Sequence, residues 1–500
     1  MNTFMNGLKT ANNYAITENG ALTHKSTMDG LMDLFAMGAA YRSRSDEDVI
    51  LLFKNAFAAD PVYAMKCLFY IRDVRGGQGE RRFFRVATKW LASNETDAMK
   101  RNLIHVPEFG RWDDLFAFIG TPLQEDALNI VKHQLALDVQ CKTPSLLGKW
   151  MPSENTSSMK TRKTASVVRK HLGMTSKQYR KTLSILRARI NVLERLMSEG
   201  RWDEIEFDKI PSKAGLKYKN AFALHDIERM KKNPEVKTYA DFAKDTTTKV
   251  NAKDLYPYEV VDKAVKASNR SMDDTDRLMV NKFWDNLADY FNGKSLNALA
   301  VVDTSGSMTW HGGAAAPINV AISLGMYCAE RAKGPFAGHY VSFASRPQLI
   351  EVNGVDFVDK VKRIYRTNLC DNTNIEATFD MLLDTAIRNH CAQSDLPENI
   401  IVISDMEFDA ARGYYGRSQN SKTLMENIRE KWARAGYRMP HLIYWNVEAR
   451  QNNIPEDIGV GNISYVSGMS PSIFEQIMSG KTGYDLMMEK LNSERYAVIH

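Results

Sequence analysis

Short apolar runs alternate with helical patterns along the second half of the chain, and this alternation constrains the fold more than any other feature. The run SLNALAVVD (Ser295–Asp303) is mostly apolar and ends in an acid, and similar runs follow at Asn399–Ser404 and His441–Asn446. Segments with apolar residues three or four positions apart separate these runs. Strands that alternate with helices form parallel sheets with helices on both faces. We therefore expect a doubly wound α/β domain over residues 293–500.

Residues 1–292 carry a different pattern, in which apolar residues recur every three or four positions. Asp46–Ala59, Pro61–Arg72 and Glu125–Leu137 are examples, and they predict helices. The hexapeptide GRWDDL (Gly110–Leu115) returns as GRWDEI (Gly200–Ile205), which is a weak internal repeat. In a repeat array each helical pair buries its apolar face against its neighbours. The sequence thus predicts an α-helical repeat module over residues 1–292.

Composition narrows the class of protein. A chain of 500 residues is too long for one core, and its 44% apolar and 25% charged residues are typical of globular proteins. It contains no apolar run of about 18 residues and no apolar signal core, so we expect neither membrane insertion nor export. Its five cysteines are widely spaced and include no CxxC pair. We expect a cytoplasmic monomer.

The net charge of +6 is unevenly distributed. The segment from Lys142 to Arg189 holds twelve cations and a single acid, Glu154. Such an excess attracts polyanions, although a solvated helix face is the alternative interpretation. The cations are Lys142, Lys149, Lys160, Arg162, Lys163, Arg169, Lys170, Lys177, Arg180, Lys181, Arg187 and Arg189.

Polar clusters follow or precede the predicted elements of the α/β domain, at the strand ends where ligands collect in such sheets. DTSGS (Asp303–Ser307) follows the first strand, DNTN (Asp371–Asn374) precedes a helix, and Asp405 follows the strand Asn399–Ser404. Together they offer carboxylates and hydroxyls but no sulfur. This hard-oxygen set suits Mg²⁺ or Mn²⁺. The alternative is that Asp303 and Ser305 only cap the following segment.

These clusters resemble the metal-ion-dependent adhesion site of von Willebrand factor A domains. The resemblance implies that Asp303, Ser305 and Ser307 are ligands from the first loop, Thr373 from the second and Asp405 from the third. The second loop departs from the family, which often has glycines where Asp371 and Asn372 stand.

The first half resembles, more distantly, the TROVE module of Ro-type RNA-binding proteins and related uncharacterised proteins that join such a module to an A domain. The similarity lies in RDVRGGQGERRFF (Arg72–Phe84), PEFGRWDDL (Pro107–Leu115), GRWDEIEFDKIPSKAG (Gly200–Gly215) and LYPYEVV (Leu255–Val261). It implies a ring of HEAT-like helical repeats closed by the A domain. It also implies binding of single-stranded RNA ends or small structured RNA.

Two basic segments are candidates for the RNA contact. In RDVRGGQGERR, arginines flank a glycine loop whose amides could approach a phosphate, although Arg72 and Asp73 could equally pair with neighbouring helices. The stretch Gly148–Leu172 reads as a basic loop that leads into a helix. The candidate RNA-binding residues are Arg72, Arg75, Arg81, Arg82, Lys149, Lys160, Arg162, Lys163, Arg169 and Lys170. The repeated Trp112 and Trp202 read as core residues.

Three functions remain open, in order of preference. The first is a non-enzymatic RNA-binding protein with a metal-binding A domain. The second is a protein-interaction module or scaffold without RNA, in which the metal captures an acidic side chain of a partner. The third is a metal-dependent hydrolase, which is ranked last because no histidine or other base accompanies the single metal site.

Overall fold

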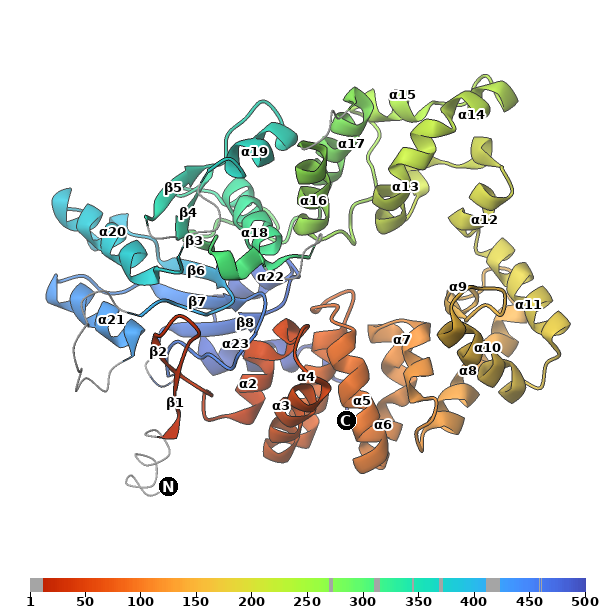
Figure 1. Cartoon of the computed structure of the whole chain (residues 1–500), viewed down its shortest axis with the longest axis horizontal. Helices are drawn as coiled ribbons and strands as arrows, with labels where there is room; N and C mark the ends of the chain where they lie inside the picture. The colour runs from red at the N-terminus through yellow and green to blue at the C-terminus, as the bar shows by residue number, and fades with distance from the viewer. Residues whose placement is uncertain are drawn as a thin grey trace. The chain divides into compact units, whose positions relative to one another are not determined.

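We analysed a computed structural model of the whole chain, which describes residues 12–268, 273–309, 315–343, 346–367, 372–410, 423–457, 459 and 461–500. The chain divides into two compact units, each built from two segments of sequence (Figure 1). Unit 1 comprises Met1–Cys67 and Ala252–Ser493, and unit 2 comprises Leu68–Asn251 and Glu494–His500.

Unit 1 is built on a six-stranded sheet with the strand order β5-β4-β3-β6-β7-β8. Five strands run parallel, and only β5 at one edge pairs antiparallel with its neighbour. The central strands are buried along almost their whole length, as expected for a sheet covered on both faces. The strands are β3 (Ala298–Asp303), β4 (His339–Phe343), β5 (Gln348–Glu351), β6 (Asn399–Ser404), β7 (His441–Asn446) and β8 (Ile463–Ser467).

Helices connect the strands of this sheet. Strand β4 lies on one side of β3 in the sheet, and β6 lies on the other side. Crossovers between parallel strands are right-handed. The helix α18 (Pro317–Arg331), between β3 and β4, and the helix α20 (Ile375–Arg388), before β6, therefore lie on opposite faces of the sheet. At Gly325 of α18 a Cβ would lie 2.5 Å from Cγ2 of Val302, so this glycine lets the helix approach the sheet closely. The predicted doubly wound α/β fold is confirmed, and the remaining helices of this part are α19 (Phe357–Ile364), α21 (Leu424–Arg434), α22 (Ile473–Ile477) and α23 (Gly483–Leu491).

Segments from the first half of the chain also belong to unit 1. A short antiparallel hairpin, β1 (Tyr14–Ile16) and β2 (Leu22–His24), bonds through the His24 backbone to the backbone of Ile454. Helix α2 (Gly30–Met37) packs on β8 and on α3 (Asp46–Ala59). Helices α16 (Pro257–Ser268) and α17 (Asp274–Asp285) pack on α19, and α16 also packs on α18. The compact units therefore divide differently from the sequence boundary at 292/293, because these N-terminal segments pack on strands, helices and loops of the α/β domain.

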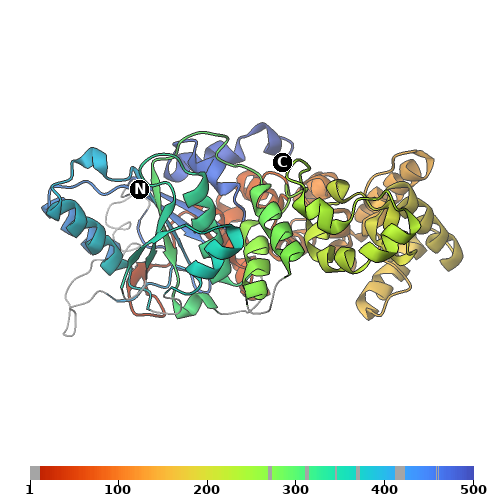
Figure 2. The same ribbon diagram turned by 90° about the horizontal axis from the view of Figure 1, so that it is seen from above.

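Unit 2 is helical, as predicted for this part of the chain. Its helices pack mainly against sequence neighbours, for example α8 on α9, and α13 on α14 and α15. They are labelled in Figure 1, and Figure 2 gives the same ribbon seen from above. The helix α4 (Pro61–Arg72) crosses from unit 1, and its ends match the predicted ones. The other helices are α5 (Arg82–Asn94), α6 (Thr96–Asn102), α7 (Val106–Phe109), α8 (Gln124–Gln140), α9 (Leu147–Trp150), α10 (Met159–His171), α11 (Ser176–Arg189), α12 (Leu193–Ser198), α13 (Ser212–Leu224), α14 (Asp226–Lys232) and α15 (Tyr239–Lys244), with 3₁₀ turns η3 (Trp112–Phe118) and η4 (Trp202–Glu204).

The two copies of the repeated hexapeptide adopt the same local structure. Trp112 begins η3 and Trp202 begins η4. Trp202 is buried and stacks on the ring of His225 at 3.8 Å, as expected for a core residue, whereas Trp112 is only partly buried. The closed ring implied by the resemblance stays a prediction.

Within the part of the chain that the structure describes, no helix is long and apolar enough to cross a membrane.

Candidate metal centre and basic helical face

The sheet brings the first and third predicted metal loops to the same edge. Strands β3 and β6 are parallel neighbours, with Val302 opposite Ile403. The residues that follow, Asp303 and Ser404, therefore lie side by side. The Ser404 hydroxyl donates to Oδ2 of Asp303 at 2.6 Å.

The first loop folds back on its aspartate. The backbone N–H of Ser305 donates to Oδ1 of Asp303 at 2.9 Å, and the hydroxyl oxygens of Ser305 and Ser307 lie 3.0 Å apart. Asp303 and Ser305 are almost completely buried. The loop thus brings one carboxylate and two hydroxyls together at the end of β3.

The third loop supplies the second carboxylate. Asp405 is buried, accepts a hydrogen bond from Ser307, and has its Oδ2 3.3 Å from Nη2 of Arg450. Burial, and then the charge of Asp405, raise the pKa of Asp303 above its ordinary value. Burial also raises the pKa of Asp405, although Arg450 opposes this shift. The two buried carboxylates repel each other when both are charged, and a bound divalent cation would offset this repulsion.

Thr373 of the second loop is buried and contacts the residues that follow Asp405 in the third loop. Its carbonyl oxygen accepts from the N–H of Asp409 at 2.9 Å, and its hydroxyl accepts from the side-chain amide of Asn19 at 3.2 Å. Asn374 caps α20 by accepting from the N–H of Ala377. Asp371, which precedes them, lies outside the described residues, as does His311.

The donor set fits a hard divalent cation. Asp303, Ser305, Ser307 and Asp405 are joined by direct contacts, and Thr373 joins them through Asn19 and the third loop. Among the described residues no group of three or more His, Cys, Asp or Glu side chains could hold a metal. Ligation here would therefore rest on two carboxylates and three hydroxyls, the chemistry of Mg²⁺ or Mn²⁺ with retained waters.

Four residues of this region were not predicted from the sequence. Glu407 is buried, and burial above all raises its pKa to about 7. Its Oε2 accepts from the N–H of Glu18, in the turn of the N-terminal hairpin, at 2.8 Å. Asn19 follows in the same turn, and Arg450 lies between Glu18 and Asp405. Glu407 stands two positions after Asp405, but the others lie far from the motif in sequence.

The basic segment of unit 2 places exposed cations on the helices α10 and α11, and these cations together are here called the basic face. The stretch Gly148–Leu172 was predicted to be a loop that leads into a helix, and its second half is the helix α10, where Lys160, Arg162 and Lys163 lie in the first turns. None of the cations of the basic face forms an ion pair with any residue that the structure describes. The basic face consists of the exposed residues Lys160, Arg162, Lys163, Lys170, Lys177, Arg180 and Lys181.

Other cations of the same segment serve the fold. Arg169 pairs with Glu154 at 2.9 Å and donates to the carbonyl of Met174. Arg187 donates to the carbonyls of Gly148 and Met151, and so holds the loop that precedes α10. The structure thus assigns Arg169, a candidate RNA contact, to an internal ion pair.

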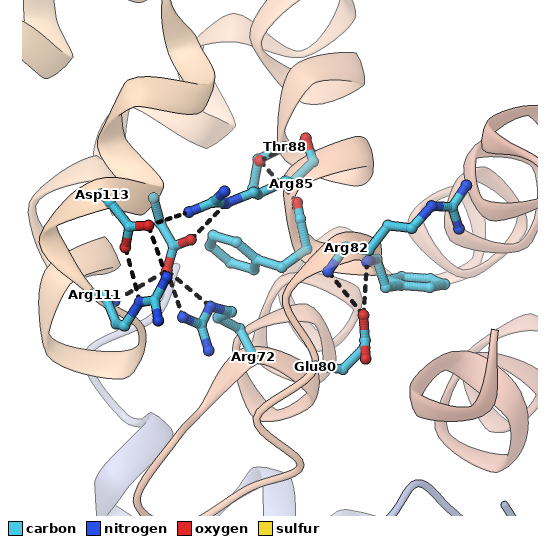
Figure 3. Close-up of polar contacts among 10 residues, drawn as sticks. Arg72, Glu80, Arg82, Arg85, Thr88, Arg111 and Asp113 are labelled. Atoms are coloured by element: carbon cyan, nitrogen blue, oxygen red, sulfur yellow. Dashed lines mark hydrogen bonds and ion pairs between the residues drawn. The ribbon is translucent and has the colours of Figure 1, made fainter. Parts of the chain in front are cut away.

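In the glycine-rich segment, Arg72 is buried in an ion-pair network. Arg72 is 2% exposed, and its Nε and Nη2 donate to Oδ2 of Asp114 at 2.8 and 2.7 Å. Arg85 and the backbone N–H of Arg111 donate to the same carboxylate (Figure 3). Arg72 therefore pairs inside the helical core, as the alternative interpretation of this segment expected, and its guanidinium is not exposed for an RNA contact.

The other predicted contacts near this segment stay at the surface. Arg75 is exposed and pairs with Glu108 at 3.5 Å. Arg81 is exposed, and burial of part of its side chain together with the nearby Arg111 and Arg85 lowers its pKa. Arg82 is half-buried, and its backbone N–H donates to Glu80 at 2.8 Å (Figure 3). Lys149 is half-buried, with its Nζ 5.6 Å from the ring of Trp150.

Comparisons with known proteins point to families without an established function. The model of the family described as a domain of unknown function (DUF2828) matches residues 17–145 and 145–295, and that of a second domain of unknown function (DUF7788) matches residues 297–497. The chain is 28% identical over 505 residues to uncharacterized protein L728 of Acanthamoeba polyphaga mimivirus, covering 94% of this chain and 85% of that protein. It is also similar to the crystal structure of the Ro (RSR) protein of Deinococcus radiodurans, with a TM-score of 0.41 and 14% identity over 90% of this chain and 93% of that chain.

Proposed function

The chain belongs to the family described as a domain of unknown function (DUF2828), and we propose that it is a cytoplasmic RNA-binding protein of Ro type. In this proposal the basic face of unit 2 binds the phosphates of single-stranded ends or of small structured RNA. The α/β domain of unit 1 holds one Mg²⁺ or Mn²⁺ ion, and the protein acts without catalysing a reaction.

The observation that carries the RNA proposal is the uncompensated charge of the basic face. The only acid between Lys142 and Arg189 is Glu154, and Arg169 already neutralises it. Lys160, Arg162 and Lys163 also lie at the beginning of α10, where the helix dipole is positive and opposes further cations. The repulsion among these cations raises the free energy of the unbound protein, and bound phosphates would remove that repulsion.

The experiment that tests RNA binding is the salt dependence of affinity for a labelled single strand with a free 3′ end. For single strands the slope of log affinity against log salt is roughly −0.7 per phosphate contacted. Replacing Lys160, Arg162 and Lys163 together by Ala should lower the magnitude of this slope by up to about 2. Affinity should fall by similar factors for all sequences, because phosphates carry no sequence information.

A matched control keeps the change in net charge but moves it to unit 1. Arg363, Arg388 and Arg434 are exposed, and each pairs with an acid four residues earlier on its helix. Their joint replacement by Ala should leave both affinity and slope unchanged. A slope equally affected by the two triple variants would mean that net charge alone matters, and would refute the basic face as the RNA site.

The metal proposal rests on the two buried carboxylates and three hydroxyls at the ends of β3 and β6 and at the start of α20. Asp303, Ser305, Ser307, Thr373 and Asp405 would hold the ion. A cation that binds only the folded state should raise the melting temperature as its concentration increases. Asp303→Ala should abolish this rise with Mg²⁺ and Mn²⁺, whereas a rise unchanged in that variant would refute the site.

The alternative function is a metal-dependent protein-interaction module without RNA. Its supporting feature is the same site, since a metal with an open position can bind an acidic side chain of a partner. Wild-type RNA affinity no better than that of a neutral control protein, combined with an intact metal response, would favour this alternative.

A further inference from the structure

The helices of the basic face can hold phosphates, but they present no Phe, Tyr or Trp ring to solvent. The one such residue on α10 and α11 is Tyr179, which is 1% exposed and donates its hydroxyl to the carbonyl of Pro152 at 2.8 Å. Proteins that prefer single strands stack bases on aromatic rings or on arginine planes, in addition to their phosphate contacts. The proposed binding of single-stranded ends therefore needs a stacking surface elsewhere in unit 2.

Trp150 provides such a surface. It is the last residue of α9, which packs on both α11 and η3, and it is partly exposed. The guanidinium carbon of Arg111 lies 3.9 Å from the centroid of the Trp150 ring, and the Nζ atom of Lys149 lies 5.6 Å from a ring centroid of the same side chain. A guanidinium over an indole combines a flat aromatic surface with a positive charge. A nucleotide, which joins a flat base to a phosphate, has the complementary features.

Hydrogen bonds hold Arg111 over the ring. Its Nε and Nη2 donate to the two carboxylate oxygens of Asp113 at 2.8 and 2.7 Å, and its backbone N–H donates to Asp114 at 3.0 Å. Figure 3 shows Asp113 bonded to Arg85 as well as to Arg111. The guanidinium is therefore already ordered in the free protein, so its ordering adds little to the entropic cost of binding.

Positive charge exceeds negative charge around this pair. The two acids that contact Arg111 are already shared with two further arginines. Arg81 is exposed, and neither it nor Lys149 forms an ion pair with a residue that the structure describes. Partial burial, and then the charges of Arg111 and Arg85, lower the pKa of Arg81, so these guanidinium groups are close enough to repel each other. A phosphate among them would remove this repulsion.

We propose that Trp150 and Arg111, here called the stacking pair, bind an unpaired base of single-stranded RNA, and that Arg81 and Lys149 bind the phosphates next to it. This inference rests on the proposed RNA-binding function and adds the subsite that selects single strands. The bases of a duplex are paired and stacked on each other, so they do not reach the stacking pair. The basic face contributes affinity for any RNA, whereas the stacking pair contributes only where a base is unpaired.

A strand without bases separates stacking from phosphate binding. The probes are a labelled single strand of RNA, an abasic strand of the same length and phosphate number, and a blunt RNA duplex. We expect the wild-type protein to bind the single strand at least about fivefold more tightly than the abasic strand, since one stacked base contributes at least that factor. Fluorescence anisotropy with the full chain measures the affinity for all three probes.

Substitutions of Trp150 test the stacking pair. Trp150→Leu keeps an apolar side chain but removes the ring, so it should abolish the preference for the single strand over the abasic strand and leave the affinities for the abasic strand and the duplex unchanged. Trp150→Phe keeps a ring and should retain part of the preference. A substitution that only loosened the fold would weaken binding of all three probes together. The control is Trp90→Leu, since Trp90 of α5 is also partly exposed and this variant should keep the full preference.

The phosphate contact of Arg81 has a different signature. Arg81→Gln should lower the magnitude of the slope of log affinity against log salt by about 0.7, for the single strand and the abasic strand alike. The preference between these strands should stay, because a phosphate contact does not involve the base. The matched control is Arg101→Gln, since Arg101 of α6 is exposed and also has no ion pair among the described residues. A slope unchanged in Arg81→Gln, or lowered equally by Arg101→Gln, would overturn the role of Arg81.

The outcomes also distinguish this inference from the function on which it rests. Wild-type protein that binds no RNA would refute the RNA-binding function and the stacking pair together. Equal wild-type affinity for the single strand and the abasic strand, or a preference that Trp150→Leu retains, would refute the stacking pair. The RNA-binding function would survive that result if the triple variant of Lys160, Arg162 and Lys163 still lowered the magnitude of the salt slope.

Discussion

The buried carboxylate of Asp114 is the point at which the helical unit should be most sensitive to a single substitution. Asp114 is fully buried and accepts four N–H groups: Nε and Nη2 of Arg72 at 2.8 and 2.7 Å, Nε of Arg85 at 2.7 Å, and the backbone N–H of Arg111 at 3.0 Å. Replacing Asp114 by Ala removes the only acid that pairs with Arg72 among the described residues, and leaves that guanidinium in the core. Breaking a buried ion pair in this way costs about 3–5 kcal/mol of stability.

The adjacent Asp113 provides a matched control for this substitution. It pairs with Arg85 and Arg111 at 2.9 and 2.7 Å, but its side chain is 22% exposed and those of its partners are 31% and 27% exposed. Solvent screens such pairs, so Asp113→Ala should cost only about 1 kcal/mol or less. The two variants remove the same charge from neighbouring positions.

Hydrogen exchange of the full chain, read on peptides that cover residues 103–118, measures the local free energy of opening for both variants. Urea denaturation provides the global value. The difference between Asp114→Ala and Asp113→Ala should be at least about 2 kcal/mol. Equal losses would refute the reasoning that burial, and not the number of ion pairs, gives this network its energy.

Three further predictions concern the α/β domain. Gly325→Ala should destabilise the protein by about 1–3 kcal/mol, and Val302→Ala in the same chain should recover part of that loss, which thermal melts of the single and double variants would measure. Burial, followed by the charge of Arg429, lowers the pKa of His441 to about 4. As the pH falls below about 6.5, the unfolded state therefore binds a proton at this histidine, whereas the folded state does not. Stability should therefore fall by up to about 3 kcal/mol toward pH 4, and urea denaturation at pH 7 and pH 4.5 should show a smaller fall in His441→Gln. Labelled RNA incubated with the protein and Mn²⁺ for hours should stay full length on a gel, and cleavage that Asp405→Ala abolishes would instead identify a hydrolase.

Local sequence patterns were sufficient for the α/β domain because its strands are short, apolar and buried. The predicted bounds of β6 (Asn399–Ser404) and β7 (His441–Asn446) are those of the structure. Parallel pairing of such strands places their carboxyl ends at the same edge of the sheet. The motif after β3 and the acid after β6 could therefore be assigned to one site from the sequence alone. The hairpin strands β1 and β2, of three residues each, carry no comparable signal.

The arginines of the helical unit mark where sequence patterns stop being informative. RDVRGGQGERR has the composition of a phosphate-binding loop, but the acid that neutralises Arg72 lies 42 residues later. The glycines have a packing role that the pattern also hides, since a Cβ on Gly77 would lie 2.1 Å from the carbonyl oxygen of Tyr70. Whether an arginine is exposed for RNA or paired inside the protein depends on where acidic side chains lie in the folded structure, and the local sequence does not show this.

The metal centre illustrates the same limit for ligands. The motif residues of its first and third loops follow the strands β3 and β6, which neighbour each other in the sheet, so these two loops could be predicted to lie together. Asn19 lies 354 residues before its partner Thr373, and the turn that contains it has no motif of its own. What encodes its role is a set of backbone contacts to the third loop, and these depend on a folded sheet.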